Sequence, residues 1–366
     1  MKIGLIGFGS MGRTHAYCVN NLKYFFDVNY PVEIKTVCTK NIENAIKAKE
    51  RFGFESFTDN EDDIINDPEI DAVDICTPNI YHYETCKKAL LAGKHIYCEK
   101  PLAVTYEQAK ELAALAKEKG LCAHMVFNNR FLLPVIKSKE IIDSGKIGRI
   151  LSFSAKYLHS SALNTNKTGW KQDKDICGGG VLFDLGSHVI DLIYYLVGEF
   201  DSVYGKSQIA YPTRLGVDGK KWQTNADEAF YMLASMKNGA AGTIEVSKIV
   251  TGANDDLSYE IHGEKGSIKF DLMNPNFLEY YSCEDKYSGY TKIECVNRYE
   301  YPAGIFPGIK APIGWLRGHI GNYFSFVSSV IENKNPCPSF DDGAYVQKVL
   351  EAGYLSDKEK KEIKLF

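Results

Sequence analysis

The segment Lys2–Gly12, with the sequence KIGLIGFGSMG, is the most informative part of the chain about its fold. An apolar run ends in a Gly-x-Gly-x-x-Gly pattern at the start of a predicted helix. In this pattern Gly7 permits a tight turn, Gly9 lets the backbone approach a pyrophosphate, and Gly12 lets helix and strand pack closely. The helix N-terminus offers free N–H groups and a partial positive charge to phosphates. We therefore predict a dinucleotide site that comprises Gly7, Phe8, Gly9, Ser10, Met11 and Gly12.

The residues that follow alternate between strand-like and helix-like patterns. Predicted strands are Lys2–Gly7, Val32–Cys38, Ala72–Cys76, Lys94–Cys98 and Leu121–Val126. Predicted helices are Ser10–Tyr24, Ile42–Phe52, Tyr81–Leu91 and Thr105–Lys119, the last with a Thr-x-x-Gln capping box. This alternation is typical of a doubly wound parallel sheet, so residues 1–126 are predicted to form an α/β Rossmann domain.

The pattern changes near Phe127. Predicted helices at 134–144, 181–197, 316–332 and 343–355 enclose a series of strand-like segments without intervening helices. These strands are predicted at 150–157, 202–210, 229–236, 242–249, 257–262, 267–272 and 291–296. Residues 127–366 are therefore predicted to form an α+β domain with a large, open, mostly antiparallel sheet that binds substrate and mediates oligomerisation.

The amino-acid composition limits the classes of partner that the protein is expected to bind. Among 366 residues, 43 Lys and Arg stand against 47 Asp and Glu, so the net charge of −4 favours neither nucleic acid nor an anionic membrane as a partner. The most apolar stretch, Val189–Val197, is shorter than the roughly 18 residues that span a bilayer and includes Asp191. The ten cysteines form no Cys-x-x-Cys pair. We expect a cytoplasmic protein with reduced thiols and no bound metal.

The end of the second predicted strand bears on the type of dinucleotide. An acidic residue there would bind the adenosine ribose hydroxyls and repel a 2′-phosphate, but the sequence offers Thr39 and Lys40. A hydroxyl and an ammonium group can both bind a 2′-phosphate, which favours NADP over NAD. Alternatively, Lys40 is a solvated charge and the cofactor is NAD.

Two further segments have residues suited to catalysis. Lys100 follows the strand Lys94–Cys98, at the edge where open parallel sheets bind ligands. In GGGVLFDLGSHVID, residues 178–191, Asp184, His188 and Asp191 would share one helix face, opposite an apolar stripe of Leu182, Leu185, Val189, Leu192 and Leu196. A carboxylate beside an imidazole suits general acid–base catalysis. A metal pair or a solvated face would give the same spacing, although a third strong metal ligand is not evident.

Together these motifs resemble the glucose–fructose oxidoreductase and inositol dehydrogenase (Gfo/Idh/MocA) family. The resemblance rests on the glycine pattern, on Thr77-Pro78-Asn79 with His82, on Glu99-Lys100-Pro101, on Asn129-Arg130-Phe131 and on the GGG-x3-D-x3-H-x2-D signature. It implies cofactor contacts from Thr77, Pro78, Asn79, His82, Glu99 and Lys100, and a cis bond before Pro101. It also implies that Lys100 and His188 act on a sugar or cyclitol hydroxyl while Asp184 holds a neighbouring hydroxyl. A homodimer or homotetramer is expected from the same resemblance.

The predicted reaction is therefore hydride transfer between NAD or NADP and a secondary alcohol or ketone, with Lys100, His188 and Asp184 as catalytic residues. Two alternatives stay open: an NAD-dependent glycoside hydrolase that oxidises its substrate transiently, and a nucleotide-binding regulator without catalysis. Further candidate substrate contacts are Arg130, Lys156 with Tyr157, and Trp170. For Arg130 a salt bridge at the domain junction is the alternative, for Trp170 core packing. His15 is interpreted as a helix-packing residue.

Overall fold

The computed structural model describes residues 1–165, 169–216, 219–296, 311 and 314–365, which fall into two compact units. The first unit contains residues 1–131 and the later segment Trp315–Ala344. The second contains residues 132–296 and 345–365. The predicted limits, 1–126 and 127–366, stay a prediction of domain organisation, and the units differ from them by including residues 127–131 and 315–344 in the first unit.

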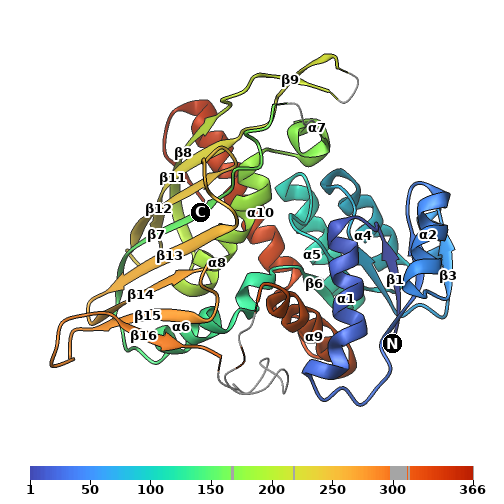
Figure 1. The fold of residues 1–366 in the computed structure, drawn as a ribbon, viewed down its shortest axis with the longest axis horizontal. Helices are drawn as coiled ribbons and strands as arrows, with labels where there is room; N and C mark the ends of the chain where they lie inside the picture. The colour runs from blue at the N-terminus through green and yellow to red at the C-terminus, as the bar shows by residue number, and fades with distance from the viewer. Residues whose placement is uncertain (166–168, 217–218, 297–310, 312–313, 366) are drawn as a thin grey trace. The chain divides into compact units, whose positions relative to one another are not determined.

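The first unit is built on a six-stranded parallel sheet with the order β3-β2-β1-β4-β5-β6 (Figure 1). Its strands are β1 Lys2–Ile6, β2 Glu33–Cys38, β3 Ser56–Thr58, β4 Ala72–Ile75, β5 His95–Cys98 and β6 Ala123–Met125. The predicted Rossmann class is confirmed. Strand β3 and the short helix α3, Glu61–Ile65, are absent from the prediction.

Local signals in the sequence set the helix boundaries of this unit. The Asn41 side chain caps helix α2 by accepting from the N–H of Glu43, and Thr105 caps α5 by accepting from the N–H of Gln108. Left-handed Gly53 and Gly120 end the same two helices. The helices are α1 Ser10–Phe25, α2 Ile42–Phe52, α4 His82–Leu91, α5 Tyr106–Lys119 and α9 Leu316–Ile331, with short 3-10 turns η1 Asn79–Tyr81 and η2 Asn128–Phe131.

Helix α9 is part of the hydrophobic core of the first unit although it comes late in the chain. Its residues Ile320, Tyr323, Phe326 and Val327 are fully buried in one cluster with apolar residues of β1 and α1. The rings of Phe26 and Phe324 stack with centroids 3.8 Å apart. This contact between residues far apart in sequence completes the layer of helices over the sheet.

The second unit is built on a nine-stranded sheet with the order β16-β15-β14-β13-β7-β12-β11-β8-β17. Among the described strands, β7 and β12 pair in parallel and the other neighbours are antiparallel, as predicted for the fold class. The strands are β7 Ile150–Leu158, β8 Phe200–Gln208, β11 Ala229–Met236, β12 Ala241–Ser247, β13 Asp256–Gly263, β14 Gly266–Asp271, β15 Phe277–Ser282, β16 Thr291–Glu294 and β17 Ile363–Lys364. A separate ribbon joins β9 Thr213–Leu215 to β10 Lys221–Gln223.

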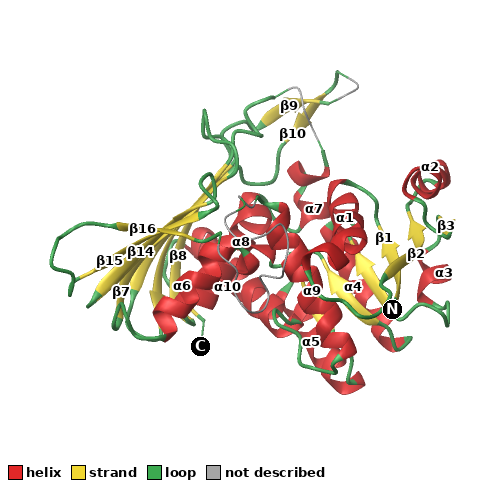
Figure 2. Ribbon diagram, turned by 60° about the horizontal axis from the view of Figure 1, so that its bottom comes forward, coloured by secondary structure: helices red, strands yellow, loops and turns green. Residues whose placement is uncertain are grey.

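Helices cover one face of this sheet and leave the other open (Figure 2). They are α6 Leu133–Asp143, α8 Ser187–Val197 and the second-unit part of α10 Phe340–Glu359, with short turns η3 Trp170–Gln172 and α7 Lys174–Cys177. The open face exposes Tyr204, Tyr231 and Leu233.

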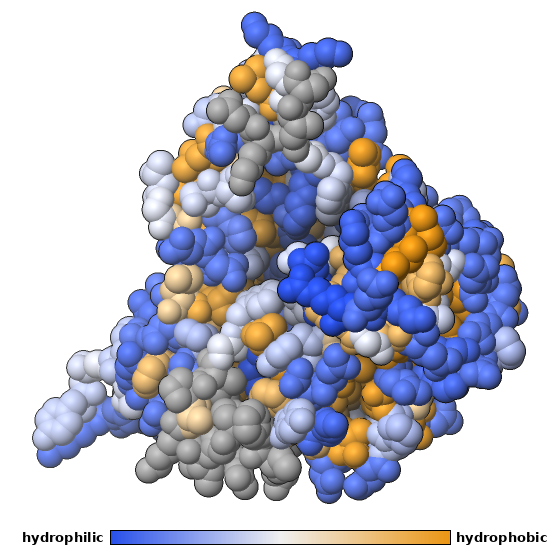
Figure 3. All heavy atoms as spheres, turned by 45° about the vertical axis from the view of Figure 1, so that its right-hand side comes forward, coloured by the Kyte–Doolittle hydropathy of each residue, from blue (hydrophilic) through white to orange (hydrophobic). Residues whose placement is uncertain are grey.

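The predicted helix 181–197 is not a single α-helix. It begins with a π-helical turn, η4 Leu182–Gly186, and continues as α8. Residues 174–197 include one stretch long and apolar enough to cross a membrane by length and composition, but 78% of that window is buried, as in a core helix. The face of the molecule shown in Figure 3 is mostly hydrophilic with scattered hydrophobic side chains.

Candidate active site

The glycine pattern forms a phosphate cradle at the junction of β1 and α1. Gly7 has φ +95°, which favours glycine, and a Cβ there would lie 2.6 Å from the Cys76 carbonyl oxygen. A Cβ on Gly12 would lie 2.2 Å from the Gly7 carbonyl oxygen, whereas the space around Gly9 is open. The tight turn at Gly7 and the close packing at Gly12 therefore agree with the pattern, and the approach of a pyrophosphate to Gly9 stays a prediction.

The end of helix α1 at this cradle fits an anionic ligand. The N-cap residue, Gly9, has no side chain that could cap the helix, and the first turn has no acidic residue. The N–H groups of Ser10 and Met11 are thus available at a positive helix end. Nearby, the buried hydroxyl of Thr77 has no hydrogen-bond partner among the described residues. These groups fit a dinucleotide phosphate. The Phe8 ring packs against Phe52 and Phe54, so Phe8 offers its backbone, and not its side chain, to the cradle.

His82, for which the resemblance implies a cofactor contact, has both ring nitrogens beside backbone carbonyl groups. Its ring is fully buried, with Nε2 at 2.8 Å from the Thr77 carbonyl oxygen and Nδ1 at 2.8 Å from the Pro101 carbonyl oxygen. Burial lowers the pKa of His82, but the Cys98 thiol and these two carbonyl groups outweigh it and raise the pKa to about 9. His82 therefore joins the Thr77 loop to the Lys100–Pro101 segment, in which the peptide bond is cis as expected.

Glu99 and Lys100 follow β5 directly. The Glu99 side chain is buried and its Oε2 accepts from the Lys100 backbone N–H at 3.1 Å. Burial raises the pKa of Glu99, but His15 and the charge of Lys100 outweigh burial and lower the pKa to about 2. A carboxylate is therefore fixed beside the lysine that the motif predicts as catalytic.

At the end of β2, the Thr39 hydroxyl donates to the Asn41 carbonyl oxygen at 2.7 Å. Lys40 is exposed and makes no ion pair within the described part of the chain. No acidic side chain stands at either position.

In the second unit, Asp184 lies between two lysines. Lys171 Nζ is 2.9 Å from both Asp184 carboxylate oxygens, and Lys248 Nζ is 2.7 Å from Oδ2. The Lys171 side chain is about half exposed, whereas that of Lys248 is 9% exposed. Asp184 is thus an oriented, ionised acceptor, and neither lysine was predicted from the sequence.

His188 lies beside a second group of polar residues. The ring of Tyr157 is 5.9 Å from the His188 ring, and its hydroxyl donates to Asp255 Oδ1 at 2.5 Å. The same oxygen is 2.9 Å from His159 Nε2. Burial raises the pKa of Asp255, but the contacts with His159 and Tyr157 outweigh it and lower the pKa.

Four expectations need revision or stay open. Asp191 is buried, with 1% exposed, so it does not belong to an exposed polar face of the helix. Lys156 points to the exposed face of β7, opposite Tyr157, which gives its predicted substrate contact no support.

Arg130 is buried and pairs with Asp342 at 3.2 Å inside the first unit, which supports a salt bridge. Trp170 is 38% exposed, so core packing is wrong and sugar stacking stays a prediction.

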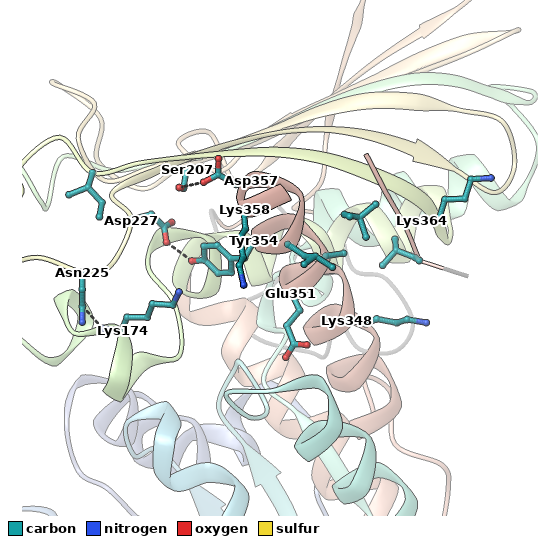
Figure 4. A pocket seen from close by; sticks show the side chains of 15 residues that line it. Lys174, Ser207, Asn225, Asp227, Lys348, Glu351, Tyr354, Asp357, Lys358 and Lys364 are labelled. Atoms are coloured by element: carbon teal, nitrogen blue, oxygen red, sulfur yellow. Dashed lines mark hydrogen bonds between the residues drawn. The ribbon is translucent and has the colours of Figure 1, made fainter. Parts of the chain in front are cut away.

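A pocket of about 670 Å³ in the second unit holds none of the predicted site residues (Figure 4). Its lining includes Tyr354 and Asp227, whose side chains are hydrogen bonded. The Tyr354 hydroxyl also accepts from the Gly180 N–H at 2.7 Å, and Asp227 Oδ2 accepts from the Leu182 N–H at 3.1 Å. This wall of the pocket therefore anchors the start of the π-helical turn that carries Asp184.

The cradle, the Rossmann sheet and the mixed sheet define a two-domain dinucleotide-binding protein. Residues 1–127 match the family model described as an oxidoreductase family, NAD-binding Rossmann fold. Residues 139–365 match the model of the C-terminal alpha/beta domain of the same family. The chain belongs to the Gfo/Idh/MocA oxidoreductase family and is an enzyme of that class, which confirms the resemblance inferred from the motifs.

Relatives match along nearly the whole chain. Levoglucosan dehydrogenase of Pseudarthrobacter phenanthrenivorans is 34% identical over 370 residues, which cover 96% of this chain and 95% of the relative. Glucose-6-phosphate 3-dehydrogenase of Bacillus subtilis is 28% identical over 359 residues, covering 97% and 96%. A solved structure of levoglucosan dehydrogenase in complex with NADH and levoglucosan has a TM-score of 0.96 at 33% identity and covers 100% of this chain and 99% of that one.

Proposed function

We propose that the protein is a sugar dehydrogenase that transfers hydride between a nicotinamide dinucleotide and a secondary ring hydroxyl of a sugar or sugar derivative. The observation that carries this proposal is the similarity over the full chain to a dehydrogenase solved with NADH and levoglucosan. The second relative is named for oxidation at carbon 3 of a sugar phosphate, which supports a ring hydroxyl as the reacting group.

The residues of each unit have separate proposed tasks. A bound dinucleotide would supply the hydride acceptor, and the cradle at Gly7–Gly12 together with Thr77 would hold it. In the oxidation direction His188 takes the proton of the reacting hydroxyl. The Lys100 ammonium stabilises the developing alkoxide, and protonated His188 returns the proton when the reaction runs in reverse. Asp184, held by Lys171 and Lys248, accepts a hydrogen bond from a neighbouring hydroxyl.

The proposal includes both NAD and NADP. Thr39 and the exposed, cationic Lys40 support NADP because either can bind a 2′-phosphate and no carboxylate repels it. The levoglucosan dehydrogenase structure with NADH supports NAD instead.

Sugars, sugar phosphates, anhydrosugars and cyclitols should be screened with NAD and NADP in parallel, with nicotinamide absorbance as the readout and reactions without sugar as controls. We expect net reduction of one dinucleotide with at least one sugar. Sugar release without net reduction would favour the glycoside hydrolase. Binding of NADH without turnover of any compound or its keto form would favour a regulator and contradict the proposal.

A cytoplasmic location and self-association complete the proposal. All ten cysteines are free thiols, which fits a reducing compartment. The open sheet face, with Tyr204, Tyr231 and Leu233 exposed, suits a homodimer or homotetramer because a second copy would remove these side chains from water.

A further inference from the structure

His15 lies on the cradle helix α1 and faces two carboxylates. Its ring is fully buried, with Nδ1 at 2.8 Å from Asp74 Oδ1 on β4. On the other side, Nε2 is 3.3 Å from Glu99 Oε1, an ion pair without a well-formed hydrogen bond. One imidazole ring therefore bridges the strand next to β1 and the residue that precedes Lys100.

The charges of this cluster must balance inside the protein. Asp74 is also fully buried and Glu99 is 6% exposed, and two unpaired carboxylates at such positions would be strongly destabilising. A protonated His15 places one positive charge between the two carboxylates, whereas a neutral ring would leave both of their charges without a counter-ion on this side. Burial lowers the pKa of His15, but Asp74 and Glu99 outweigh it and raise the pKa to about 10.

The thiols and phenols around His15 are neutral, so the positive charge remains on the His15 ring. The Tyr97 and His319 rings lie 5.1 and 6.4 Å from it. The Tyr323 ring lies 5.9 Å from the His15 ring, and its hydroxyl donates to Asp74 Oδ2 at 2.9 Å. The thiol of Cys76 is 3.1 Å from Nδ1, and burial raises its pKa as it does those of Cys18 and Tyr323. The thiols and phenols thus stay neutral.

The same cluster could in principle hold a metal ion, since ligand atoms of His15, Asp74 and Cys76 lie within 4.8 Å of one another. A metal bound there would displace the proton of the Cys76 thiol. It would also remove the proton from Nδ1, and with it the cation that faces two carboxylates.

We propose that His15 is a permanently charged positioning residue, an imidazolium that keeps Glu99 ionised and fixes the Glu99–Lys100 segment against the cradle helix. The inference rests on the proposed function only in giving Glu99 and Lys100 a role in the reaction. The charge of His15 itself is independent of any substrate.

The direct test is the ¹⁵N NMR spectrum of the full chain labelled at histidine, recorded at about pH 8.5, two units above the ordinary pKa of histidine. The signal that disappears in His15→Gln should have both ring nitrogens protonated; His82, with a similarly raised pKa, is identified by His82→Gln. A neutral tautomer for His15 would overturn the proposal. So would a metal found by elemental analysis with a metal-shifted His15 signal.

A charge-balance cycle tests the positioning role. His15→Gln leaves two carboxylates without their cation, whereas His15→Gln with Asp74→Asn restores the net charge of −1. We expect NADH affinity, measured by fluorescence titration, to fall about tenfold in the single variant and to recover in the double variant. His124→Gln is the matched control, because His124 is equally buried but its pKa is lowered to about 3, so it is neutral.

Additive losses in the double variant, or an equal loss of NADH affinity in His124→Gln, would show that His15 only packs. If His15→Gln does not fold, Asp74→Asn identifies the His15 signal instead. The spectrum of the unaltered protein then still shows whether both ring nitrogens of His15 are protonated. Failure to find a sugar substrate would contradict the proposed function but leave these outcomes unchanged.

Discussion

At the scale of single residues, Asp184 shows how charge prepares a substrate contact. Two lysine ammonium groups, from Lys171 and Lys248, hold its carboxylate. The carboxylate stays ionised, and the buried side chain of Lys248 fixes its orientation. A substrate hydroxyl would therefore meet an acceptor whose direction is already set, which lowers the entropy cost of positioning.

The catalytic roles of His188 and Lys100 give the first residue-scale prediction. His188→Ala and Lys100→Ala should each lower kcat about 10²-fold or more, because one removes the proton acceptor and the other the alkoxide's cation. NADH should still bind, as fluorescence titration would report. His262→Ala and Lys110→Ala, half-exposed and exposed side chains elsewhere, serve as controls. Near-normal turnover in both active-site variants would contradict the roles.

Residue positions divide into those a sequence can reveal and those it cannot. The alternation Phe153, Ala155, Tyr157 on β7 already indicates that Lys156 points the other way. Lys248 and Asp255, in contrast, meet Asp184 and Tyr157 only because the sheet brings distant strands together. The local sequence pattern does not indicate which distant strands will lie side by side.

At the scale of elements, the π-helical turn η4 determines which side chains meet. Its five residues shift the register between Asp184 and the following α-helix α8, which carries His188. The turn is anchored by Tyr354 and Asp227 through the N–H groups of Gly180 and Leu182. The apolar periodicity of 181–197 predicted the helix correctly, but periodicity cannot distinguish an α from a π turn over so few residues.

Removal of that anchor gives an element-scale prediction. Tyr354→Phe leaves the Gly180 N–H without its acceptor and should lower the free energy of unfolding by about 1 kcal/mol. It should also lower kcat, because Asp184 loses its fixed position. Tyr345→Phe is the matched control, since Tyr345 accepts from the Phe200 N–H at 2.7 Å, at the start of β8. Urea unfolding and turnover are measured together; equal kcat values in the two variants would contradict the anchoring role.

At the scale of the whole molecule, stability should depend on pH in two directions. The pKa of Glu99 is lowered from 4.5 to about 2, so its contribution is present above pH 4.5 and is lost as pH falls toward 2. The pKa of His15 is raised from 6.5 to about 10, so its contribution is present below pH 6.5 and is lost as pH rises toward 10.

Urea unfolding over this range should therefore give a maximum near pH 6.5, because the lowered pKa of His124 adds a loss of stability below that pH, and a decline toward pH 10. His15→Gln should reduce the alkaline decline without removing it, because the pKa of His82 is also raised, to about 9, whereas His124→Gln should leave the alkaline decline unchanged. An alkaline decline of the same size in all three proteins would assign the effect to other groups.

The overall organisation was only partly predictable. The glycine pattern and the strand–helix alternation predict the Rossmann sheet well, but β3 was missed because Ser56–Thr58 has too few residues to show alternation. Helix α9 was predicted near its true bounds, yet its apolar face does not indicate which unit it joins. Only the packing of Ile320 and Phe326 against α1 and β1 answers that.

The late position of α9 also affects how the protein is made. Translation releases the Rossmann strands first, but part of their hydrophobic core is supplied by residues 320–327, near the end of the chain. Until these residues leave the ribosome, the apolar side of α1 stays exposed on the nascent chain, where it is open to chaperones and to aggregation. The cofactor-binding half, although first in sequence, is thus among the last parts to complete its fold.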